Sequence, residues 1–182
     1  MPKIELEKEI DLETVLKFAT EKHKGQKRDN GDEYISHPIR VAKLVDEYKA
    51  KYSKNREVLV AAALLHDTLE DTYTSYRELS EKFGDVVASI VLELSTAKYG
   101  SKLIGKARYL AEKMQMMTNY ALTIKLADRY DNICDLESTS NEKRIRTIDD
   151  TKFIVAYLEK ERKLTKTQQL FVNIIKEKIK EF

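Results

Sequence analysis

Residues 56–71 read REVLVAAALLHDTLED, an apolar run that passes directly into a cluster of polar residues. The apolar side chains recur three and four positions apart, which is the spacing of one face of an α-helix, as at Val58, Ala62 and Leu65. The run therefore predicts a buried helix. It leads into His66 and Asp67, so we expect an imidazole and a carboxylate beside a hydrophobic core, where ionisable groups are costly without partners.

Two further carboxylates follow this pair. Glu70 lies four residues after His66 and Asp71 four after Asp67, so a continuous helix would place them on the same two faces one turn later. Burying several carboxylates together would drive some of them to take up protons unless a cation offset their charge. A bound divalent metal would resolve that cost.

His37 and Asp128 are the remaining candidate metal ligands. Pro38 suits the first position of a helix, because its fixed φ fits there and its missing N–H is not needed, so we expect His37 just outside a helix start. Asp128 interrupts an apolar helical run, and Asn132 follows it one turn later. Two imidazoles and two carboxylates favour Mn²⁺, with Fe²⁺ or Co²⁺ as alternatives.

The rest of the chain predicts an all-α fold. Only 5 Gly and 2 Pro occur among 182 residues, a length that suits one domain over residues 1–182. We expect helices from Leu12 to near Lys24, after a capping box at Ser75 and Glu78, after a cap at Asp85, and over residues 105–117, 120–136, 142–162 and 166–182. The last helix is amphipathic and is expected to dock on the core rather than on a membrane or a partner.

The composition of the chain limits the kinds of binding partner that we expect. The 33 basic and 31 acidic residues give a net charge of +2, so no overall field favours nucleic acid. No apolar run approaches the roughly 20 residues that cross a bilayer, and the N-terminus lacks the apolar core of a signal peptide. A single cysteine, Cys134, cannot form an internal disulfide and is expected to be a small buried hydrophobe. These features predict a cytoplasmic protein that binds a small molecule, with its oligomeric state open.

Several ordered motifs resemble the hydrolase domain of the Rel/SpoT alarmone enzymes, and the length is similar to that of stand-alone small alarmone hydrolases. The likeness covers about Leu16 to Leu136. Its matching stretches are HKGQKR at residues 23–28, Gly31, YISHP at 34–38, AALLHDTLEDT at 62–72, Phe83-Gly84 and KLADR at 125–129. Such a domain is an all-α HD domain with a metal site between its helices.

The resemblance implies roles for single residues. His37, His66, Asp67 and Asp128 would bind Mn²⁺, Glu70 and Asp71 would serve the hydrolytic water, and Arg28 and Asn132 would contact the substrate. The implied reaction removes pyrophosphate from the 3′ position of guanosine tetra- or pentaphosphate, or of the adenosine equivalents. We expect His23 to fasten the polar loop at residues 24–31 rather than to bind metal.

Three departures from the family pattern bear on the substrate. Asp29 and Asp131 stand where a lysine and a histidine are frequent, and Cys134 stands where an arginine is common. With fewer cations at these positions, we expect weaker binding of a second diphosphate group. Two alternatives therefore stay open: an HD phosphohydrolase acting on another nucleotide or a phosphorylated dinucleotide cofactor, and a nucleotide-binding protein without turnover.

Overall fold

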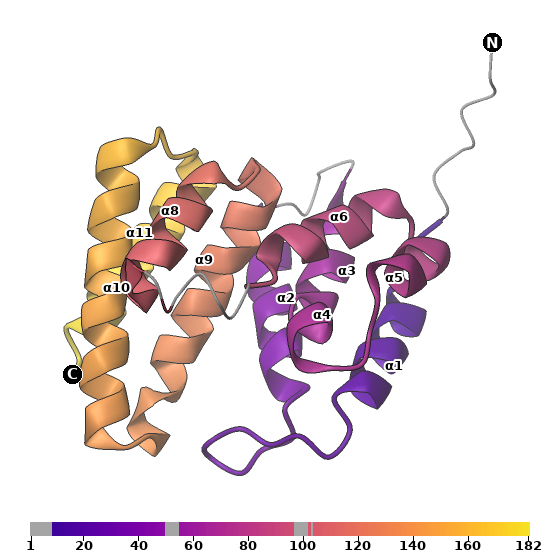
Figure 1. Ribbon diagram of the computed structural model, residues 1–182, viewed down its shortest axis with the longest axis horizontal. Helices are drawn as coiled ribbons and strands as arrows, with labels where there is room; N and C mark the ends of the chain where they lie inside the picture. Colours follow the sequence, from indigo (N-terminus) through magenta and orange to yellow (C-terminus); the bar gives the residue numbers. More distant parts are fainter. Residues whose placement is uncertain (1–8, 50–54, 97–101, 103) are drawn as a thin grey trace.

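The protein is built from α-helices, as the sequence predicts. The computed structural model describes residues 9–49, 55–96, 102 and 104–182. Its helices are α1 (Leu12–Lys22), α2 (Ser36–Lys49), α3 (Arg56–Leu65), α4 (Thr68–Asp71), α5 (Tyr76–Phe83), α6 (Asp85–Leu94), α8 (Lys106–Met116), α9 (Asn119–Cys134), the 3₁₀ turn η1 (Asp135–Ser138), α10 (Asn141–Glu161) and α11 (Lys166–Ile179) (Figure 1). An isolated β-bridge between Lys27 and Glu33 closes the loop between α1 and α2.

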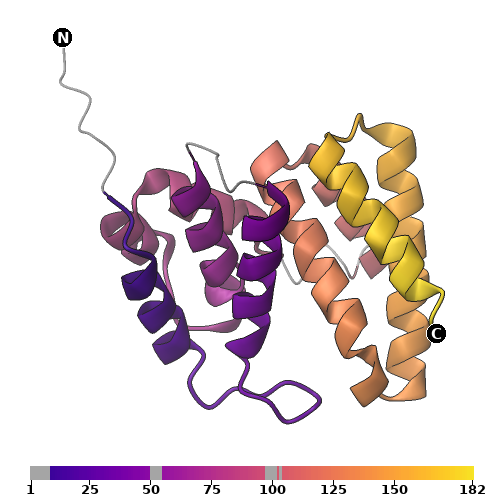
Figure 2. The ribbon, with the colours of Figure 1, turned by 180° about the vertical axis from the view of Figure 1, so that it is seen from behind.

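Helix α9 is the central helix of the fold. It lies between a group formed by α1 to α6 and a group formed by α8, α10 and α11 (Figures 1 and 2). It packs against α2, α3 and α6 on one side and against α8, α10 and α11 on the other. Every residue from 121 to 128 is consequently buried, polar ones included. Asp128 thus lies where the two groups of helices meet.

Helix α2 begins earlier than predicted. It starts at Ser36, so His37 lies inside its first turn and Pro38 is its third residue rather than its first. The first four N–H groups of a helix have no partner within it, so proline is tolerated throughout this turn. The consequence is that His37 is held by regular helical backbone.

The break between α3 and α4 corrects the prediction of one continuous helix through His66 and Asp71. Side chains take the place of helical N–H donors here, because His66 Nδ1 contacts the Ala63 carbonyl at 2.8 Å and Thr68 Oγ1 donates to the Leu65 carbonyl at 2.7 Å. Such bonds end a helix by satisfying its last carbonyls. Glu70 therefore does not lie one turn above His66 on a shared helix.

Two predicted caps differ from those observed. Ser75 accepts from the Glu78 N–H as expected, but the Glu78 carboxylate pairs with Lys22 at 2.9 Å, so only half of the capping box forms. The N-cap of α6 is Gly84, whose φ of 90° suits glycine, and Asp85 is the first residue inside the helix. The ion pair with Lys22 prevents Glu78 from completing the capping box, and the positive φ of Gly84 makes this glycine, rather than Asp85, the N-cap of α6.

Helix α11 docks on the core, which confirms the prediction for the C-terminal segment. It packs chiefly against α9. Phe171, Val172 and Ile175 are fully buried, and the Phe171 ring meets Tyr48 edge-on with a centroid distance of 5.5 Å. No helix within the described ranges is long and apolar enough to span a membrane.

Replacing Phe171 with Ala should lower the free energy of unfolding by about 3–5 kcal/mol, because the substitution removes a buried ring and leaves a cavity. The neighbouring Leu170, which is 39% exposed, provides the control. Leu170→Ala should cost less than about 1 kcal/mol. Urea denaturation followed by circular dichroism measures both values, and equal losses would contradict docking through Phe171.

Candidate metal centre

Four ionisable side chains meet where α2, the turn between α3 and α4, and α9 come together. His37 comes from α2, His66 follows α3, Asp67 precedes α4, and Asp128 comes from α9. His37, His66 and Asp128 each offer a ligand atom within 4.8 Å of the others. The Asp67 Oδ2 lies 3.1 Å from His66 Nε2 and 3.7 Å from His37 Nε2. The structure thus brings together all four residues that the sequence singled out.

The two imidazoles are oriented with Nε2 toward the carboxylates. His66 contacts a backbone carbonyl through Nδ1, and His37 contacts the Asp131 carboxylate through Nδ1 at 2.6 Å. Both side chains are 1% exposed. The buried Nε2 of His66 has no hydrogen-bond partner among the residues described. A buried acceptor nitrogen aimed at two carboxylates fits a bound divalent cation.

The charges of the cluster support the same fit. Burial would raise the pKa of Asp128, yet Lys125, at 2.9 Å, and the two imidazoles hold it well below its usual range. Burial also opposes ionisation of Asp67, whose pKa His66 and Lys125 nevertheless lower. Although burial disfavours a charged imidazole, hydrogen bonds to Asp128 and Asp131 raise the pKa of His37 to about 9. The carboxylates are therefore ionised and attract positive charge, which a divalent ion would supply.

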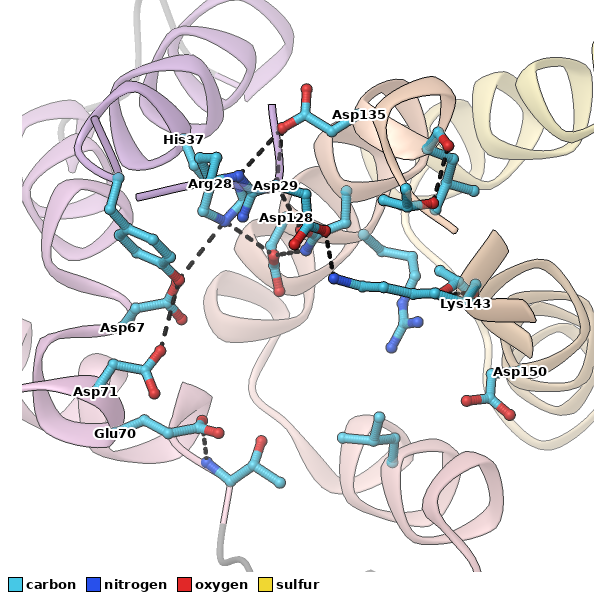
Figure 3. Close-up of a pocket in the computed structure, with 18 of the residues that line it drawn as sticks. Arg28, Asp29, His37, Asp67, Glu70, Asp71, Asp128, Asp135, Lys143 and Asp150 are labelled. Carbon is cyan, nitrogen blue, oxygen red and sulfur yellow. Dashed lines mark hydrogen bonds and ion pairs between the residues drawn. The ribbon is translucent and has the colours of Figure 1, made fainter. Parts of the chain in front are cut away.

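Tyr34 and helix α4 connect the cluster to two more carboxylates. The Tyr34 hydroxyl donates to Asp67 Oδ2 at 2.6 Å and reaches Asp71 Oδ2 at 3.5 Å. Burial and the Asp67 carboxylate raise the pKa of Tyr34, so the phenol remains a donor. The Glu70 Oε2 accepts from the Thr96 N–H at 2.8 Å. Glu70 and Asp71 lie on the Asp67 side of the centre (Figure 3).

A pocket of about 520 Å³ opens over the centre. Asp67, Glu70 and Asp71 line one wall, while Lys143 and Asp150 of α10 lie opposite (Figure 3). The α8–α9–α10 side also contributes the cationic residues Lys106, Arg129 and Arg146. The pocket therefore joins a carboxylate-rich end to an end where four cations outnumber the Asp150 carboxylate.

Arg28 and Asn132 lie together at the pocket wall. Arg28 donates to Asn132 Oδ1 at 3.0 Å and, through Nε and Nη2, to Asp135 Oδ2 at 3.1 and 2.8 Å. Asn132 in turn donates to Asp128 Oδ1. Asn132 thus links Arg28 to a candidate metal ligand, and both residues line the pocket.

The three departures noted in the sequence have different surroundings. Asp29 lines the pocket and forms an ion pair with Lys143 of the opposite wall. The Lys143 ammonium group therefore already has a carboxylate partner. Asp131 does not line the pocket but faces His37 and Arg40. Cys134 is half-buried rather than buried, and it too lies away from the pocket lining. Among these three, only Asp29 is placed to touch a ligand in the pocket.

His23 has the contacts of a residue that fastens the loop. Its Nδ1 bonds to Gln26 Oε1 at 2.8 Å, and its ring stacks on Tyr34 with a centroid distance of 4.8 Å. Gln26 donates onward to the Asp71 carbonyl at 2.9 Å. His23 is buried but lies outside the group of ligand atoms at the centre.

Sequence reasoning assigned no role to Tyr34, Lys125, Arg40 or Asp135. All four contact site residues from another element or from a neighbouring turn. Lys125 had a usable signal, because a lysine within an apolar helical run and three residues before Asp128 predicts a buried ion pair. The other three are brought to the site by tertiary packing.

Comparison with known proteins places this arrangement in a family. A family model described as HD domain matches residues 15–163. The guanosine-3′,5′-bis(diphosphate) 3′-pyrophosphohydrolase of Aquifex aeolicus is 37% identical over 157 residues, which cover 81% of this chain and 21% of that protein. The bifunctional (p)ppGpp synthase/hydrolase SpoT of Escherichia coli K12 is 36% identical over 138 residues, covering 73% of this chain and 19% of SpoT. The chain spans about a fifth of the length of these relatives.

Solved structures agree with the sequence relatives. The structure of a metazoan ortholog of SpoT, described as hydrolysing ppGpp, superposes with a TM-score of 0.75 and 28% identity over 90% of this chain and 92% of that one. A Listeria monocytogenes structure shares the fold, with a TM-score of 0.61 and 22% identity over 82% of this chain and 99% of that one. The chain therefore belongs to the HD domain family, and it is a homologue of the Rel/SpoT hydrolases.

Proposed function

We propose that this protein is a Mn²⁺-dependent pyrophosphohydrolase that removes the 3′-pyrophosphate of (p)ppGpp-type nucleotides, giving GDP or GTP. The observation that carries the proposal is one continuous pocket with a candidate metal centre at one end and cations at the other. The names of the relatives described above support the same activity. The adenosine nucleotide (p)ppApp presents the same phosphates and is included in the proposal.

His37, His66, Asp67 and Asp128 would hold the metal. Two imidazoles and two carboxylates suit Mn²⁺, and Fe²⁺ or Co²⁺ have compatible preferences. A divalent cation in this position would activate water and neutralise charge on the phosphoryl oxygens. Lys125 and Asn132, both hydrogen-bonded to Asp128, would hold that carboxylate in place.

Glu70 and Asp71 would handle the proton of the attacking water. Both line the pocket on the side of the metal centre, and α4 carries them on the turn that follows Asp67. Tyr34 fixes this geometry by contacting both Asp67 and Asp71. A positioned carboxylate at hydrogen-bonding distance from the water is what general base catalysis requires.

The cationic end of the pocket suits a second phosphate group. Lys106, Arg129 and Arg146 line this end of the pocket. Burial lowers the pKa of the Arg129 guanidinium, and the nearby carboxylates of Asp128 and Asp150 only partly oppose this shift. An anion at this end would offset that charge. Arg28 and Asn132 would contact the nucleoside between the two ends.

Product identity tests the proposal. Purified protein with Mn²⁺ should release pyrophosphate from ppGpp or ppApp. Release of orthophosphate from another 2′- or 3′-phosphorylated nucleotide would favour the alternative HD phosphohydrolase. Binding of nucleotide without any release, by protein that retains metal, would indicate a binding protein instead.

Arg146→Ala should raise the KM for ppGpp about tenfold while leaving kcat nearly unchanged, because a charged contact to phosphate is worth about 1.5 kcal/mol. The KM for a nucleotide with a 3′-diphosphate but no 5′-phosphate should not change. Lys152→Ala, on the same helix but away from the pocket lining, is the charge-matched control. Equal effects on both substrates would contradict a second phosphate site at Arg146.

A further inference from the structure

A buried Arg–Asp pair lies directly behind His37. Asp131 is 3% exposed, and its Oδ2 contacts His37 Nδ1 at 2.6 Å. Arg40 binds the same carboxylate twice, from Nε to Oδ1 at 2.7 Å and from Nη2 to Oδ2 at 2.9 Å. Both Asp131 oxygens are thus occupied by donors, and one is shared with the imidazole.

These contacts belong to a closed ring of hydrogen bonds and ion pairs. Arg40 Nη2 also donates to Asp135 Oδ2 at 2.8 Å, and Asp135 accepts from Arg28. Arg28 donates to Asn132, and Asn132 donates to Asp128 Oδ1. This oxygen lies 3.3 Å from His37 Nε2, which closes the ring. The ring thus includes two candidate metal ligands, His37 and Asp128. Each of its members contacts a neighbour from a different element or from the next turn.

The contacts of Asp131 define the state of His37. A carboxylate held by arginine is an acceptor, so it accepts a hydrogen bond from the Nδ1–H of His37 and directs Nε2 toward the centre as the ligand atom. A carboxylate behind a ligating histidine raises the basicity of the ligand and fixes its ring. Asp131 does not line the pocket, so it has no direct contact with a ligand there.

We propose that Asp131 is a positioning residue that sets the tautomer and orientation of His37 for metal binding, and that Arg40 acts only by holding Asp131. The proposal rests on the metal centre of the proposed function. It assigns to Asp131, a departure from the family pattern, a role at the metal rather than at the substrate. The opposing view is that the pair contributes only to stability.

The Mn²⁺ dissociation constant of the metal-stripped protein tests the proposal. Asp131→Asn should weaken Mn²⁺ binding by about 10- to 100-fold. Asparagine keeps the shape but has a donor –NH₂ in place of one oxygen, which must face either Arg40 or His37. Arg40→Gln should weaken binding less. The double variant should match Asp131→Asn alone, because the two residues act in series.

A second Arg–Asp pair, which joins α2 to α3 and is more exposed than the Asp131 pair, provides a control of the same residue types. Asp46, near the other end of α2, binds Arg56 in a bidentate pair at 2.5 and 2.6 Å. Asp46→Asn should lower Tm without changing the Mn²⁺ dissociation constant. At saturating Mn²⁺, Asp131→Asn should recover most of kcat with an unchanged KM for nucleotide.

A folded Asp131→Asn protein with wild-type Mn²⁺ affinity would overturn the proposal. If that variant does not fold, the Mn²⁺ affinity of Arg40→Gln is the deciding measurement. A wild-type Mn²⁺ affinity of Arg40→Gln would then overturn the proposal. Mn²⁺ binding is measured without nucleotide. A wild type that binds Mn²⁺ but releases no pyrophosphate would therefore overturn the proposed reaction, while the variants still decide the role of Asp131.

Discussion

Asp128→Ala should abolish Mn²⁺ binding and reduce kcat/KM for ppGpp by about 10³-fold or more, because several kcal/mol of charge stabilisation depend on the bound cation. The Asp128 carboxylate is contacted by several site residues: Lys125, Asn132 and His37 all lie within 3.3 Å of its oxygens. Its removal would also leave Lys125 as an uncompensated buried charge. Metal analysis of the purified protein and pyrophosphate release measure the two losses.

The isosteric variant Asp128→Asn distinguishes loss of the metal ligand from loss of the fold. Asp128→Asn preserves volume, so it should fold even if Asp128→Ala does not, and it should still lose metal. Asp150→Asn is the control, since Asp150 lines the opposite wall of the same pocket (Figure 3). Retention of one equivalent of Mn²⁺ by the folded Asp128→Asn protein would show that this carboxylate is not a ligand.

Glu70→Gln should retain Mn²⁺ but lower kcat by about 10²- to 10⁴-fold, the usual contribution of a general base. Glutamine can still accept from the Thr96 N–H, so the local fold should persist, but it cannot take a proton from water. KM and the Mn²⁺ dissociation constant should change little. Steady-state kinetics with metal analysis of the same sample give all three quantities.

Glu93 provides a control of the same type for Glu70. Its carboxylate also accepts a backbone N–H from the start of a following segment, that of Thr118, but it lies outside the pocket over the metal centre. Glu93→Gln should leave kcat unchanged. If Glu70→Gln is fully active and Asp71→Asn is not, the proton transfer belongs to Asp71.

Periodicity was sufficient for most of the fold because it reports on local geometry. The apolar spacing through residues 56–65 and 166–179 predicts helices that the structure contains. The ends of helices were harder to predict. The end of α3 at Leu65 depends on where the side chains of His66 and Thr68 find carbonyls, and the Glu78 carboxylate binds Lys22, a residue distant in sequence.

The candidate metal centre was predictable because its residue types are costly to bury without a cation. His66 and Asp67 follow an apolar run directly, and Asp128 interrupts another, so their burial could be inferred from the sequence. The surroundings of the centre were not predictable in this way. Tyr34 and Arg40 look like ordinary polar residues along the chain, and only packing places them against Asp67 and Asp131.

By itself, therefore, the sequence determined an all-α fold and singled out His66 and Asp67, since helical periodicity and the cost of buried charge are both visible in neighbouring residues. The assignment of His37 and Asp128 to the same site depended more on the resemblance to the Rel/SpoT family. The tertiary structure alone decided that Asp131 faces His37 rather than the pocket, and that cations from α8, α9 and α10 form the far end of that pocket. The reason is physical: the contacts of a side chain across two helices depend on how those helices pack, and spacing along one chain segment carries no information about that packing.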